Sequence, residues 1–117
     1  MNRTIQHTYH VPGTLTANMS LPFKLYSDAS LVHVSAVGSN ANDATLKIGN
    51  SGDDDAYLLA AAIGDSGSPV EFERDNFVGG ADPHIKKGTT MLLTLDYDGA
   101  GGTAAQNVTL VLTFTEG

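Results

Sequence analysis

The sequence predicts an all-β protein, an antiparallel sandwich of two sheets. Apolar and polar residues alternate along several stretches, and clusters of Gly, Pro, Asn, Asp and Ser separate these stretches. No segment has the 3.6-residue apolar stripe of an amphipathic helix. About seven to nine strands are expected at the spacing of a sandwich or barrel, and this number suits two four-stranded sheets. A jelly roll is therefore the preferred topology, with an immunoglobulin-like Greek-key sandwich as the alternative.

The first long alternation runs over residues 11–25, where the odd positions are mostly apolar. It predicts a half-buried strand or a bent pair of strands, and Pro22 marks a sheet edge or a bend because it cannot donate a ladder hydrogen bond. The alternation then moves to the even positions of the next strand, Val32, Val34 and Ala36. This pattern predicts that Leu31 and His33 face the opposite side.

The middle of the chain is more ambiguous. Residues 45–48 form a short strand in this interpretation, and the alternation of Val70 and Phe72 with acidic residues predicts another. The apolar run 56–63 fits a short helix or a strand buried on both faces, and its pattern does not choose between them. Residues 74–88 are expected to be a long connection with one short strand near His84 and Ile85.

The last third has the clearest pattern. Two alternating stretches flank a Gly-rich turn at residues 98–102 and predict two strands with their apolar side chains in the core. The apolar positions are Met91, Leu93, Leu95 and Tyr97 in the first stretch, and Val108, Leu110, Leu112 and Phe114 in the second.

The N-terminal residues are assigned to an arm, 1–12, that precedes a sandwich domain at 13–117. Pro12 and Gly13 separate the two parts. The arm is a candidate for strand addition to a neighbouring subunit or partner, with Ile5, His7, Tyr9 and Val11 as the partner-binding residues. The alternative is an ordinary first strand of the sheet.

Composition and charge exclude several classes of protein. The 117-residue chain has six Lys and Arg, thirteen Asp and Glu, a formal net charge of −7, and no cysteine. The acidic balance argues against broad binding to nucleic acid or anionic membranes, and the lack of cysteine excludes disulfides and thiolate metal sites. No signal-peptide pattern and no apolar run of about 20 residues is present. We expect a protein made in a reducing cytoplasm.

No catalytic motif stands out, so we expect a protein that is not an enzyme and needs no cofactor. No serine lies in a Gly-x-Ser-x-Gly elbow. His7 and His10 are three residues apart on an expected strand, so they face opposite sides and would not share a metal ion. His33 is expected to be a hydrogen-bonded polar residue rather than a ligand.

The carboxylates offer two further hypotheses. Asp53–Asp55, and Asp96 with Asp98, have the oxygen-rich character that calcium prefers, although turn chemistry explains them better. A small hydrolase using Glu71 or the Asp53–Asp55 cluster is a weak alternative, because glycosidase chemistry needs two facing carboxyl groups.

A carbohydrate- or receptor-binding module of a fibre or an enzyme is the stronger alternative, with Tyr26 and Tyr57 as candidate stacking platforms. The chain has no tryptophan, which weakens this hypothesis. Phe23, Phe72 and Phe114 lie in phase with the apolar positions and are expected to be in the core.

Two stretches resemble small structural proteins of tailed bacteriophages, in particular capsid (head) decoration or cement proteins. One is residues 44–72, including Ile-Gly-Asp-Ser-Gly-Ser-Pro-Val-Glu-Phe, and the other begins at Gly88 and includes Leu-Asp-Tyr-Asp-Gly at 95–99 and all of 102–117. The resemblance covers most of residues 13–117. It implies a jelly-roll virion protein that binds the major capsid protein on the outside of the shell and assembles as a homotrimer.

Overall fold

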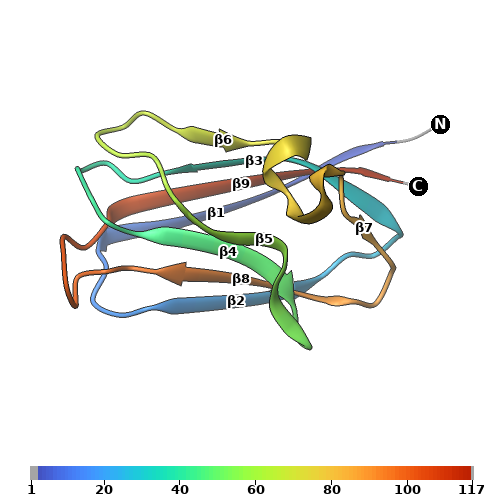
Figure 1. The fold of residues 1–117 in the computed structure, drawn as a ribbon, viewed down its shortest axis with the longest axis horizontal. Coiled ribbons are helices and arrows are strands. Elements are labelled where there is room, and N and C mark those ends of the chain that lie inside the picture. The colour runs from blue at the N-terminus through green and yellow to red at the C-terminus, as the bar shows by residue number, and fades with distance from the viewer. Residues whose placement is uncertain (1–2, 117) are drawn as a thin grey trace.

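The computed structural model describes residues 3–116, which fold into two β-sheets packed face to face (Figure 1). One sheet has the strand order β1-β9-β3-β6, with β7 also paired to β3, and the other has the order β2-β8-β4-β5. The strands are β1 (Thr4–Thr14), β2 (Met19–Lys24), β3 (Ala29–Val37), β4 (Thr45–Asn50), β5 (Asp53–Ala62), β6 (Val70–Phe72), β7 (His84–Ile85), β8 (Thr90–Asp96) and β9 (Gln106–Glu116).

This strand order is that of a jelly roll. The chain passes from one sheet to the other at almost every connection, and all the named strand pairs are antiparallel. Eight strands in two four-membered paths form the double Greek key of that fold, with the two-residue β7 added at one side. The fold class predicted from the sequence is confirmed.

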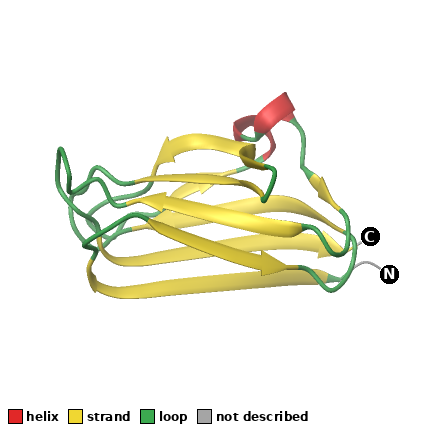
Figure 2. Ribbon diagram, turned by 90° about the horizontal axis from the view of Figure 1, so that it is seen from below, coloured by secondary structure: helices red, strands yellow, loops and turns green. Residues whose placement is uncertain are grey.

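Two short 3-10 turns, η1 (Arg74–Asn76) and η2 (Val78–Gly80), lie in the connection between β6 and β7 and are the red segment in Figure 2. The expected short strand in this connection is β7. Among the described residues, we find no helix with the length and apolar character needed to cross a membrane.

The core lies between the sheets and is filled by the inward-facing side chains of both. The two alternating stretches of the last third supply a large part of it, since every inward residue of β9 from Val108 to Phe114 is at most 1% exposed. The expectations for Phe72 and Phe114 are confirmed, whereas Phe23 is half-buried. No polar or charged residue in the described part of the chain is fully buried.

The prediction that Leu31 faces the side of β3 opposite to Val34 and Ala36 is wrong. Leu31 lies in the core together with Val34 and Ala36, although it is an odd number of residues from both. The register of β3 against β9 shifts between Leu31 and His33, so a β-bulge exchanges the inward and outward positions there.

The ambiguous run 56–63 belongs mainly to β5, which pairs with β4 and is strongly irregular. The chain crosses so closely over Gly49 that a Cβ at this position would overlap the backbone of Asp53 and Asp54. Helix propensity is therefore overridden by pairing with β4.

The N-terminal segment is part of the sandwich. β1 pairs with β9 continuously from Thr4 to Val11, and the register then shifts before Thr14. Gly13 has a φ of 79° at this bulge, and its amide donates to the side chain of Asn107. Residues 4–14 therefore form the first strand of the sheet, which is the alternative interpretation of the arm.

Candidate functional site

The candidate site is the side of the sandwich where the edge strands β1 and β2 face each other across the core. The inward side chains of both strands are only half-buried here, although they pack against the buried core. We call this group the β1–β2 seam; it consists of Ile5, His7, Tyr9 and Val11 from β1 with Met19, Leu21 and Phe23 from β2.

His7 is the polar member of the seam. Its ring lies 4.9 Å from the ring of Phe23 and 5.7 Å from that of Phe114, measured between centroids. Its Nε2 atom is enclosed and has no hydrogen-bond partner. Burial lowers the pKa of His7, because the charged imidazolium loses water without gaining an acceptor.

Tyr9 extends the same aromatic contact along β1. Its ring lies 5.8 Å from that of Phe23, and burial raises the pKa of its hydroxyl. Phe23 of β2 therefore contacts two residues of β1, and these contacts join the two edge strands across the sandwich.

The outward face of β1 is attached to β9 by side-chain hydrogen bonds between directly paired residues. Gln6 donates to Thr113 over 3.3 Å, and His10 Nδ1 lies 2.9 Å from the hydroxyl of Thr109. His7 and His10 thus face opposite sides of the sheet, as the sequence predicted.

The start of β1 is held to the end of β9 by an ion pair. Arg3 donates twice to Glu116, over 3.2 and 3.1 Å, and Ser27 donates to the same carboxylate over 2.9 Å. The bond from Arg3 is the main cause of the lowered pKa of Glu116.

The four residues predicted to bind a partner do share one face of β1. That face points into the sandwich rather than away from it, so these side chains are accessible only along the open side of the seam. Their role in partner binding stays a prediction. The inward residues of β2 were not identified from the sequence as part of this site, although apolar and polar residues alternate at 19–23 as they do in β1.

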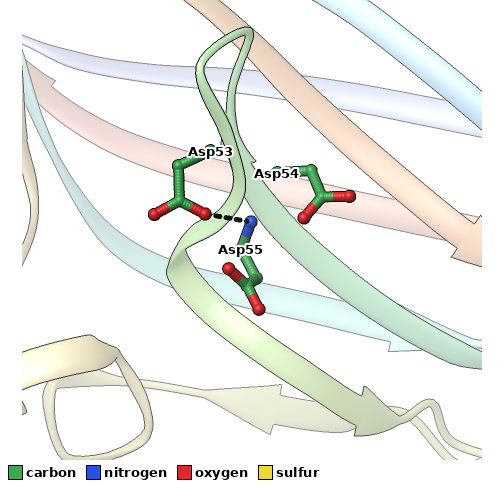
Figure 3. A group of neighbouring side chains, drawn as sticks. All are labelled: Asp53, Asp54 and Asp55. Carbon is green, nitrogen blue, oxygen red and sulfur yellow. Dashed lines mark hydrogen bonds between the residues drawn. The ribbon is translucent and has the colours of Figure 1, made fainter.

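The acidic cluster lies on the bulged start of β5 (Figure 3). Carboxylate oxygens of Asp53, Asp54 and Asp55 all lie within 4.8 Å of one another. The pKa of Asp55 is raised, chiefly by its side-chain hydrogen bond with Asp53. Lys47 Nζ lies 3.0 Å from Asp54 and already supplies a positive charge to the cluster.

Local hydrogen bonds from backbone amides account for two of the candidate calcium-binding carboxylates, Asp53 and Asp96. Asp53 accepts the amide of Asp55, and Asp96 accepts the amide of Asp98, which is the pattern of an Asx turn. These contacts match the turn interpretation, and calcium binding stays an untested hypothesis.

The other candidate residues do not form one site. Glu71 Oε1 lies 3.1 Å from Nε2 of His33 on the outer face of β3 and β6, so His33 is hydrogen-bonded as expected. The ring of Tyr26 is exposed and lies 6.0 Å from the guanidinium of Arg3, whereas Tyr57 is half-buried and bonded to Asn50.

A shallow hollow of about 130 Å³ lies elsewhere, on the outer face of the β2-β8-β4-β5 sheet. It is smaller than the cavities that enclose most small-molecule ligands, which measure roughly 300–1,000 Å³. Its lining residues are Asn18, Thr45, Lys47, Ala60, Thr94 and Asp96.

The fold is similar to that of a solved phage capsid chain. A chain of the cyanophage Pam1 capsid asymmetric unit superposes with a TM-score of 0.59 at 16% sequence identity, covering 99% of this chain and 85% of that one. No protein-family model and no curated protein sequence matches the chain. At this identity, the likeness shows a shared fold over nearly all of this chain and most of the other.

Proposed function

We propose that this chain is a non-enzymatic structural protein of a tailed-phage virion. It binds the major capsid protein on the outside of the head and stabilises the shell as a decoration or cement protein. The observation that carries the proposal is the jelly-roll likeness to a chain of a phage capsid asymmetric unit, joined to the sequence resemblance to capsid decoration proteins.

The extent of the structural match supports a structural role in the capsid. Because the match covers almost all of one chain and most of the other, the two chains are similar in length. The likeness is therefore to most of a capsid chain rather than to a small part of one.

The residues suggested for hydrolysis give catalysis little support. Glu71 is exposed and bonded to His33, and Asp54 is paired with Lys47. A binding role needs no such constellation, since a protein that binds only the assembled shell stabilises it by mass action. We further propose that the bound form is a homotrimer.

The test is sedimentation with shells of the phage that encodes the chain, stripped of their outer proteins. We expect the protein to pellet with the shells up to a fixed ratio and to raise the temperature at which they melt. An unrelated acidic protein of similar size and charge is the control. If the protein stays in the supernatant at saturating concentration, the proposal is wrong.

A further inference from the structure

The four edges of the two sheets differ in how they are protected against pairing with another strand. β6 is only three residues long, β2 has Pro22 and Lys24 exposed along its edge, and β5 begins with the acidic cluster Asp53–Asp55. Short length, proline and charge are the usual devices that keep an exposed edge from pairing.

β1 has none of these devices over most of its length. Its eleven residues include no Lys, Arg, Asp or Glu, although the chain contains nineteen in total, and its only proline is at position 12 beside the bulge. One edge of β1 pairs with β9, and no strand in the described part of the chain pairs with the other. The backbone from Thr4 to Val11 is therefore an open template for a further strand.

The side chains beside this edge also lack a cover. The β1–β2 seam leaves its apolar groups half-buried, and Nε2 of His7 has no partner. A strand added to β1 would place every second side chain over the seam, because side chains alternate across a sheet. Apolar side chains at those positions would extend the core.

A second whole copy of this chain fits the edge poorly. Because β2 faces β1 across the core, joining two sandwiches through β1 would bring β2 of one against β2 of the other. That approach would bring together two copies of the β2 edge, each with an exposed Pro22 and Lys24, in molecules that each have a net charge of −7. A single extended segment meets only β1 and the seam, and an uncharged segment matches the uncharged edge.

We propose that the free edge of β1 binds an extended, uncharged segment of a capsid subunit, which joins the sheet as a new outer strand and covers the β1–β2 seam. This inference rests on the proposed function and adds to it the chemistry of the partner. Main-chain hydrogen bonds would supply the affinity, and alternate apolar side chains would supply the specificity.

Hydrogen exchange of the protein, free and bound to stripped shells, tests the inference. In the free protein, we expect the β1 amides that point to β9 to be protected and those that point away to exchange quickly. On the shells, we expect the fast amides between residues 4 and 11 to become protected. Binding with protection gained only elsewhere would overturn the inference and leave the proposed function intact, whereas failure to bind would overturn both.

Protection that appears at these amides when the free protein is concentrated would instead identify a second copy as the occupant, and would also overturn the inference.

A pair of charge variants gives an independent readout. Thr8→Lys places a charge on the open edge strand, whereas Ser20→Lys places the same charge on an exposed position of β2. We expect Thr8→Lys to weaken shell binding about tenfold or more and Ser20→Lys by less than about twofold. Equal effects of the two would contradict the inference.

Discussion

His7→Phe tests the account of the β1–β2 seam. The substitution keeps an aromatic ring against Phe23 and Phe114 and removes the enclosed nitrogen that has no partner. An unsatisfied buried polar group costs about 1–3 kcal/mol, and the lower end applies because the ring is only half-buried. We expect the free energy of unfolding to rise by about 1 kcal/mol at pH 7.5, because the phenyl ring has no polar atom that needs a partner.

The gain should be larger at pH 5.5. Because the pKa of His7 is lowered in the folded protein, the unfolded chain takes up a proton first as the pH falls through about 6.5, and the wild-type protein loses stability. The rings packed on His7 are uncharged, and Tyr9 beside it stays neutral in this range. A fully shifted group would cost about 1.4 kcal/mol by pH 5.5, and we expect less than about half of this because the ring is partly solvated.

Urea unfolding at the two pH values measures both effects. His10→Phe is the matched control, because His10 is on the same strand but faces outward and is exposed. We expect His10→Phe to keep the wild-type loss of stability between pH 7.5 and 5.5. The reasoning is refuted if His7→Phe is less stable than wild type at both pH values, or if its stability falls with pH as much as that of the wild type.

Three further predictions concern the irregular start of β5 and can be checked by thermal melting. Gly49→Ala should destabilise the protein by about 1–3 kcal/mol, because its Cβ would overlap the backbone of Asp53 and Asp54. Gly101→Ala is the control and should have little effect, because a Cβ at Gly101 would meet open space. Equal effects of the two substitutions would contradict the close crossing. Asp55→Asn should raise Tm in low salt, because it relieves repulsion within the cluster, and this gain should disappear in about 1 M salt. Asp65→Asn is the control, because it removes the same charge outside the cluster. Millimolar calcium should leave Tm unchanged if these are turn residues, and a rise in Tm that Asp53→Asn abolishes would show a calcium site instead.

The period-two pattern predicted most of the fold because one face of each long strand is buried and the other is wet. It worked best for β8 and β9, where inward and outward positions alternate without interruption. It failed at Leu31 because a bulge changes the phase within β3, and a bulge leaves no residue signature in this stretch. The choice between helix and strand at 56–63 depended on pairing with β4, which is a contact between strands and not a local property.

The candidate site could be predicted only in part. The alternation of β1 identified its four inward residues, but only the topology shows that β2 lies opposite them and completes the seam. The lack of charge along β1 is visible in the sequence, yet its meaning depends on knowing that β1 is an edge and that β2, β5 and β6 are the others.

Electron cryomicroscopy of stripped shells incubated with the protein tests the central claim most directly. The account predicts density for the sandwich on the outer surface of the head, with β1 beside an extended segment of a capsid subunit. Shells that remain bare at saturating protein, or density confined to the tail, would contradict the proposal of a capsid decoration protein.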